Sequence, residues 1–214
     1  MDEHDTSASP KLKISPDTQI IRNNLVYNVN FHAQSCGSIA IDFDDESSQY
    51  NVTQNVLVYG GVKTFDGMDR QIWDNLVVYP GAAVSAGPAC FHALQSTRNL
   101  SSLHTHFFDN TCVLRPGDFA YNCGAGPAPF HNKTDHVDVH ANKFIFPNAT
   151  PQQAHNWQGA CACWPDPKIA GPCPFKNFSQ WQAAGHDVGS TVSSPTPQHA
   201  GMALLAQAKG YLGL

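Results

Sequence analysis

The densest group of side chains capable of acid–base chemistry lies between residues 42 and 70. An apolar–polar alternation over residues 39–44 predicts a strand whose Asp42 and Asp44 point to solvent, opposite its apolar side chains. If the next segment stacks on this strand at about 4.8 Å, its charged residues share one surface groove with them. The expected catalytic residues are Asp44, Asp45, Lys63, Asp66 and Arg70, with Asp42 and Asp69 binding substrate.

Two reactions would suit this set of residues. Paired carboxylates could hydrolyse a glycosidic bond, one acting as the acid and the other as the nucleophile or base. With Lys63 or Arg70 as the base and Ca²⁺ held by the acids, the same site would suit β-elimination in a uronate polymer. The structural alternative is a turn over residues 44–48, in which Asp side chains bond backbone N–H groups. Apart from Ca²⁺ in the lyase case, we expect no cofactor and no metal ion.

Histidines form a second group that could act on a sugar. His104 and His106 are two residues apart, and His136-Val-Asp-Val-His140 repeats that spacing, which places polar groups on one face of a strand. With His92 they could line the same groove, so His92, His104 and His106 are expected to bind substrate. His-x-Asp-x-His could also hold a metal. The alternative is that these residues mark the solvated side of a half-buried strand.

Aromatic side chains could stack on sugars or on one another inside the protein, and the sequence does not separate the two roles. The candidates are Trp73, Tyr79, Phe91, Phe107, Phe119, Tyr121 and Trp157. A G-x-S-x-G nucleophile motif and a phosphate-binding glycine loop are both absent from the sequence.

The elements that carry these residues follow from composition. The chain has 214 residues, a mean hydropathy of −0.30 and 14% charged residues, against about 25% in an average soluble protein. Uncharged polar residues, 16 Gly and 15 Pro therefore supply the polarity and the turns. This composition argues against a helical bundle, and 42% apolar residues argue against disorder. It favours a β-protein with many turns.

Charge and hydropathy exclude several partners. The net charge is −5 and the 12 Lys and Arg residues form no basic run, so we expect no nucleic-acid partner. No stretch approaches 18 consecutive apolar residues, so we expect no membrane span. The acidic N-terminus is not a signal peptide.

Two features nevertheless indicate secretion. The N-x-S/T sequons begin at Asn51, Asn99, Asn132, Asn148 and Asn177. The chain also has seven cysteines, of which Cys161, Cys163 and Cys173 lie in a Pro-rich loop. Disulfide bonds would stabilise that loop, and zinc is the alternative, although a CxxC pair is missing. We therefore expect a secreted, disulfide-bonded, monomeric glycoprotein.

One short phrase, Asn followed by an apolar run, recurs along the chain at intervals of 20 to 35 residues. Its copies begin at Asn24, Asn55, Asn75, Asn110 and Asn142. A repeated unit of this length without helices is typical of a β-solenoid, whereas a β-sandwich would leave the repeat unexplained. The Asn residues are expected at the corners of successive coils, in left-handed geometry, bonded to the backbone of neighbouring coils.

The segment from Ile41 to Gly61, with its Asp44-Asp45-Glu46-Ser47-Ser48 turn, resembles a signature of right-handed parallel β-helix proteins. Lys63 after Gly60-Gly61 and the tail Trp181–Ser190 extend this resemblance to the pectin-lyase-like superfamily. The resemblance implies an all-β, right-handed parallel β-helix active on carbohydrates, although this fold also hosts inert adhesins. Since the family begins with further coils, we expect a C-terminal portion of a longer protein.

The chain divides into four expected parts. Residues 1–19 form a polar segment, 20–150 the coils, 151–190 a Cys/Pro-rich loop and exit segment, and 191–214 a linker and helix. The helix is expected to cover the edge of the last coil. The expected function is glycoside hydrolase-like or lyase-like action on a polysaccharide in a groove along the coils. The alternative is a non-catalytic module that binds glycan or serves only as structure.

Overall fold

The computed structural model describes residues 18–27, 38–44, 47–81, 87–94, 104–122, 137–147, 149–150, 177–195 and 197–214. Its strands form three parallel sheets, which we name A, B and C. Sheet A contains β1 (Gln19–Arg22), β4 (Tyr50–Thr53), β7 (Arg70–Trp73), β10 (Thr105–Phe108) and β13 (Val137–His140). Sheet B contains β2 (Leu25–Tyr27), β5 (Val56–Val58), β8 (Leu76–Val78), β11 (Thr111–Val113), β14 (Lys143–Ile145) and β15 (Thr191–Ser193). Sheet C contains β3 (Ile39–Phe43), β6 (Gly61–Phe65), β9 (Ala89–Leu94) and β12 (Phe119–Asn122).

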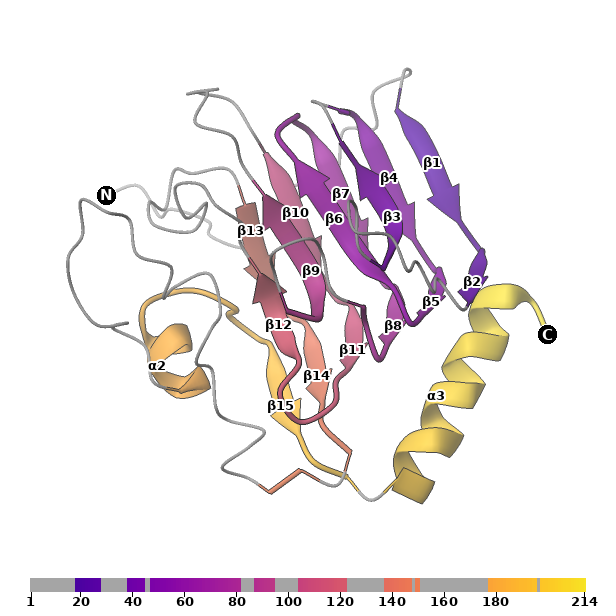
Figure 1. The fold of residues 1–214 in the computed structure, drawn as a ribbon, viewed down its shortest axis with the longest axis vertical. Helices are drawn as coiled ribbons and strands as arrows, with labels where there is room; N and C mark the ends of the chain where they lie inside the picture. Colours follow the sequence, from indigo (N-terminus) through magenta and orange to yellow (C-terminus); the bar gives the residue numbers. More distant parts are fainter. Residues whose placement is uncertain are drawn as a thin grey trace, which may run out of the picture.

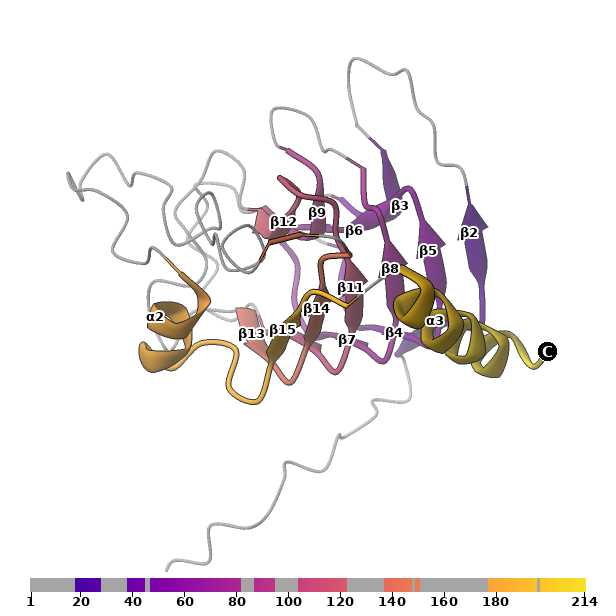
Figure 2. The same cartoon turned by 90° about the horizontal axis from the view of Figure 1, so that it is seen from below.

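The chain passes through the sheets in the order A, B, C and then returns to A. Each strand inside a sheet therefore pairs in parallel with the strand one pass earlier and the strand one pass later, as β7 does with β4 and β10. Figure 1 shows the strands of successive passes side by side, and Figure 2 shows sheets A and C on opposite sides of the interior. The described chain is thus mostly β, with stacked parallel sheets in a solenoid-like arrangement.

Alternation along each strand places one set of side chains in a shared interior. In sheet A the register aligns Val52, Ile72 and Phe107 in one buried column, and each of them is fully shielded from solvent. Leu57, Val77, Cys112 and Phe144 form the matching column of sheet B. No single pass has a core of its own, so stacking supplies the burial that stabilises every strand.

The recurring Asn residues form a ladder between the strands of sheets A and B. Asn55 donates its backbone N–H (3.1 Å) and its Nδ2 (2.9 Å) to Oδ1 of Asn75, one pass later. Asn75 and Asn110 repeat both bonds to the next Asn. The predicted corner position and backbone bonding are therefore confirmed.

One detail of that prediction was wrong, because the Asn residues themselves are not left-handed. The left-handed backbone belongs to the residue before each ladder Asn, with φ between 53° and 58°. These residues are Asn23, Gln54, Asp74, Asp109 and Ala141. The preceding residue turns the chain, which leaves the Asn side chain free to point inward and bond the next pass.

Two helices cover different parts of the sheets. Helix α3 (Pro197–Leu212) packs across the outer face of sheet B, where its Tyr211 joins Val56, Leu76 and Val113 in a second apolar cluster. The expected helix is present, but it lies on this sheet face and not over the edge of the last pass. The short helix α2 (Phe178–Ala183) instead packs Phe178 and Trp181 against the main core at that end (Figure 1).

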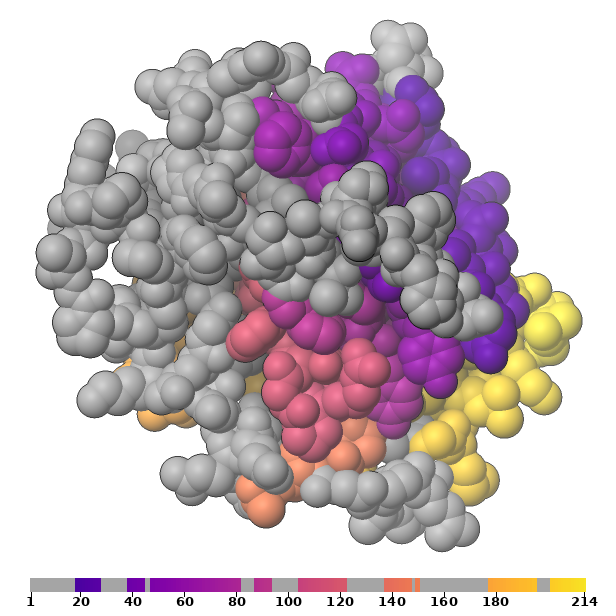
Figure 3. Space-filling model, in the orientation of Figure 1, coloured from indigo at the N-terminus to yellow at the C-terminus, as the bar shows by residue number. Residues whose placement is uncertain are grey.

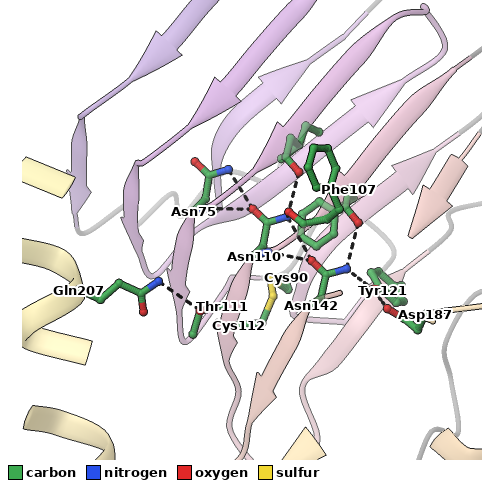
Figure 4. The surroundings of a disulfide bond; sticks show 12 residues. Asn75, Cys90, Phe107, Asn110, Thr111, Cys112, Tyr121, Asn142, Asp187 and Gln207 are labelled. Carbon is green, nitrogen blue, oxygen red and sulfur yellow. Dashed lines mark hydrogen bonds between the residues drawn. A yellow bond between two sulfur atoms is a disulfide. The ribbon is translucent and has the colours of Figure 1, made fainter. Parts of the chain in front are cut away.

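A disulfide joins Cys90 of β9 to Cys112 of β11, and both residues are completely buried. It links sheet C to sheet B across the interior, beside the Asn ladder (Figure 4). The other five cysteines, including the predicted Cys161–Cys173 loop, lie outside the described residues. Within the described ranges, no helix has the length and apolar character needed to cross a membrane.

Candidate functional site

The predicted charged residues of the first two passes meet partly on the outer face of sheet C. Asp42 of β3 is the register partner of Lys63 of β6, which is in turn the partner of His92 of β9. Lys63 Nζ lies 2.9 Å from a carboxylate oxygen of Asp42 and 3.1 Å from one of Asp44. The sheet therefore brings these three charges together, as expected.

The charge state of Lys63 follows from these contacts. Burial lowers the pKa of the ammonium, but the hydrogen bonds and charges of Asp42 and Asp44 outweigh burial, so the pKa of Lys63 lies above its ordinary value. Lys63 is therefore a cation at neutral pH and not a ready proton acceptor. The backbone carbonyl of Asp44 also accepts bonds from the Ser47 hydroxyl (2.6 Å) and backbone N–H (3.2 Å), so the main chain closes a turn here. The expected bonds from Asp side chains to backbone N–H groups stay a prediction.

Arg70 and Asp66 do not face the same surface as Asp44. Arg70 is 1% exposed and lies 5.6 Å from the ring centre of Phe43. Its Nε donates to the Ser47 carbonyl at 2.7 Å, and its Nη2 donates to the Asp66 carbonyl. Burial lowers the pKa of Arg70 to about 10, so the guanidinium stays charged. Asp66 is 4% exposed, and the catalytic roles of both residues stay predictions.

The remaining predicted residues of this region are scattered. Asp69 is exposed at a left-handed turn position (φ 55°), and His104 is exposed just before β10. Asp45 lies outside the described residues. His92 is fully buried, and burial, assisted by the charge of Lys63, lowers its pKa to about 4. It is therefore neutral at physiological pH, and neither ring nitrogen makes a hydrogen bond within the described chain.

The outer face of sheet A carries a more accessible polar row. Gln71, His106 and Asp138 are register partners on β7, β10 and β13, and His140 lies two residues beyond Asp138. Asp138 Oδ2 is 3.2 Å from Nδ1 of both His106 and His140. Those contacts hold the pKa of Asp138 well below its usual range, and Asp138 raises the pKa of His140.

An aromatic ridge runs beside this row. Trp73, Phe108 and His140 are register partners whose rings stack with centroids 5.9 Å and 5.0 Å apart and interplanar angles of 5° and 3°. Their inward neighbours Ile72, Phe107 and Val139 belong to the core, so the ridge faces outward, where its members are half-buried. Phe108 has a neighbour on both faces, whereas the second face of Trp73 looks toward the small side chain of Thr53.

Most of this face was missed by sequence analysis as a unit. His106 is predicted to bind substrate, whereas Asp138 and His140 are predicted only within the pattern His136-Val-Asp-Val-His140, which could line the groove or hold a metal. Phe108 and Gln71 were not singled out. The available signal was the repeat itself, because aligning the Asn phrases also aligns residues 73, 108 and 140 one position before the turn.

The interior holds a further buried acid. Asp187 is fully buried and accepts bonds from Tyr121 (2.8 Å), Trp181 (2.8 Å) and Ser190 (2.6 Å). Burial raises the pKa of this carboxyl despite those bonds. Figure 4 shows Asp187 and Tyr121 at the end of the Asn ladder, next to Asn142. This network joins the exit segment to the core and is closed to a polymer.

A cavity of about 500 Å³ lies at the end of the sheets formed by the first pass. Core side chains of that pass line it, among them Ile21, Val26 and Ile41, and Asp42 contributes the charge. The cavity contains neither Lys63 nor the residues of the sheet A face. Figure 3 shows the strands of the first passes in indigo and purple, next to helix α3 in yellow.

No group of three or more potential metal ligands occurs among the described residues, which do not include His136. A scan of protein-family models, a search of curated proteins and a search of solved structures each found no match for this chain. A proposal for the function therefore depends on the residues at the outer faces of sheets A and C.

Proposed function

We propose that this chain is a secreted right-handed parallel β-helix of the pectin-lyase-like superfamily that binds polysaccharide along the outer face of sheet A. The observation that carries the proposal is the aromatic ridge of Trp73, Phe108 and His140 beside the polar row of Gln71, His106 and Asp138. Sugars have apolar C–H faces and a rim of hydroxyls, so they need an apolar and a polar surface side by side.

The aromatic rings of the ridge differ in how much of their surface a ligand can contact. Ring stacking occupies both faces of Phe108, which leaves its edge for a ligand. Trp73 keeps one face toward Thr53, and that face is the ring surface on which a sugar can stack. The Gln71 amide supplies both donors and acceptors, and the two imidazoles held by Asp138 keep their Nε2 atoms for sugar hydroxyls.

The repeat, the buried disulfide and the sequons support the remaining parts of the proposal. A disulfide persists in oxidising compartments, which fits secretion. The A–B–C order of the sheets fits coils of a parallel β-helix.

Catalysis is the second candidate function, and the contact of Lys63 with Asp42 and Asp44 favours it. Asp44 and Asp42 are exposed on the outer side of sheet C and would be the carboxylates available to a substrate. Assays for reducing ends and for unsaturated uronate ends on a polysaccharide panel test this function. Activity that Asp44→Ala abolishes while the fold is retained would support it, and inactivity on every polymer would reject it.

Affinity electrophoresis through gels that contain single polysaccharides tests the binding proposal. The wild-type chain should be retarded by at least one polymer, and Trp73→Ala should weaken that binding about tenfold. The matched control is Tyr27→Ala, which removes an aromatic ring that is 65% exposed on sheet B. Equal loss in both variants, or no retardation by any polymer, would refute the proposal.

A further inference from the structure

Two sequons fall within the described residues, and the structure distinguishes them sharply. Asn51-Val-Thr53 lies in β4, and Asn177-Phe-Ser179 begins at the residue before α2. Asn51 is 4% exposed, with the paired strands β1 and β7 on either side of its own. A side chain buried to this degree leaves no room for a glycan in the folded protein.

Asn177 has the opposite surroundings. Its Oδ1 accepts a hydrogen bond from the backbone N–H of Gln180 at 3.0 Å, which caps the helix. The amide nitrogen Nδ2, the atom that a glycan modifies, is not used by that bond. Asn177 is half-buried, its backbone is extended (φ −154°), and Ser179, the third residue of the sequon, is exposed. The cap and a glycan can therefore coexist on one side chain.

We infer that Asn177 is an N-glycosylation site of the folded protein and that Asn51 is not, an inference that rests on the proposed secretion. In the reaction, Nδ2 of Asn177 forms a bond to C1 of the reducing-end N-acetylglucosamine of a lipid-diphosphate-linked oligosaccharide. The bond between C1 and the diphosphate oxygen breaks, the lipid diphosphate leaves with the electron pair, and the amide nitrogen loses one proton.

The position of Asn177 gives the glycan a physical consequence. Figure 1 shows α2 at the end of the molecule where the last strands of the three sheets, β12, β13 and β15, lie. An open sheet end can pair with the strands of another chain, and a bulky, hydrated group nearby opposes that approach. The glycan would therefore reduce end-to-end association of the sheets.

The test is expression of the whole chain behind a cleavable secretion signal in a eukaryotic cell, followed by peptide mass spectrometry. Enzymatic release of the glycan, which converts the modified Asn to Asp, marks the occupied positions. We expect conversion at Asn177 and none at Asn51. Ser179→Ala should lose the glycan at Asn177 while keeping the capping side chain, and Asn51→Gln should lose no glycan.

Two results would overturn the inference. One is unmodified Asn177 in chain that has entered the secretory pathway, whether or not another sequon is occupied. The other is a glycan at Asn51 in folded, exported protein. Failure of the natural gene product to be exported from its own cells would instead refute the proposed secretion, so the two failures are distinguishable.

Discussion

Removing one amide from the middle of the Asn ladder should destabilise the protein far more than removing one from its end. Asn110 Oδ1 accepts the backbone N–H and the Nδ2 of Asn75, each at 3.0 Å, in a region fully shielded from solvent. Its Nδ2 donates to the carbonyls of Ile72 and Phe108 at 2.9 Å. Asn75 Nδ2 also donates to the carbonyls of Val52 and Trp73, so Asn110→Ala leaves one buried donor, the Asn75 backbone N–H, without a partner. The substitution also takes one hydrogen bond from each of the two carbonyls that Asn110 Nδ2 bonds.

A buried donor without a partner costs roughly 1–3 kcal/mol and each lost carbonyl hydrogen bond about 0.5 kcal/mol, so Asn110→Ala should lower the free energy of unfolding by about 3 kcal/mol. Asn24 belongs to the same ladder, but it is exposed and water can replace its bonds. Asn24→Ala should therefore cost less than about 1 kcal/mol. Urea unfolding followed by circular dichroism measures both values. A loss at Asn110 below about 1 kcal/mol, or equal losses in the two variants, would refute the reasoning.

Three further predictions concern other parts of the molecule. The double substitution Cys90→Ala/Cys112→Ala should lower the free energy of unfolding by about 3 kcal/mol, because it releases a loop with a sequence separation of 22; an unchanged urea midpoint would contradict this. His92 has a pKa of about 4 against 6.5 when unfolded, so the unfolded chain binds the proton first and stability falls as the pH drops from 6.5 toward 4. This loss should reach roughly 3 kcal/mol and disappear in His92→Gln, and an identical pH dependence in that variant would exclude the burial argument. Asp138 raises the pKa of His140, so Asp138→Asn should lower that pKa, which NMR titration of the imidazole protons measures. The same His140 pKa in the variant and the wild-type protein would show that the contact is absent.

The repeat was the part of the fold that the sequence revealed most directly. The Asn phrases predicted stacked passes, corner positions and bonds from Asn to the backbone of neighbouring passes, because one residue type recurs wherever the backbone makes the same turn. The additional bonds between Asn side chains were not predicted. The position of α3 could not be predicted in this way. The helix docks through contacts of Tyr211 with Val56 and Leu76. These two apolar residues face outward, and the repeat alone does not indicate that a helix covers them.

The candidate site was harder to predict than the fold. Local alternation correctly grouped Asp42 with Asp44, and stacking brought Lys63 to them. The same reasoning gave no warning that Arg70 points into the core, since inward-facing arginines are rare and this one is held by backbone carbonyls. Predicting the ridge of Trp73 and Phe108 would have required knowing the register between passes. That register is hard to read from the sequence because the segments between the strands differ in length.

A crystal structure with a bound oligosaccharide tests the central claim most directly. The oligosaccharide should come from whichever polymer retards the protein in affinity gels. We expect sugar on the outer face of sheet A, with one ring against the face of Trp73 directed at Thr53 and hydroxyls bonded to Gln71 or His106. Sugar bound instead at Asp42 and Lys63 on sheet C, with the sheet A face empty, would contradict the claim.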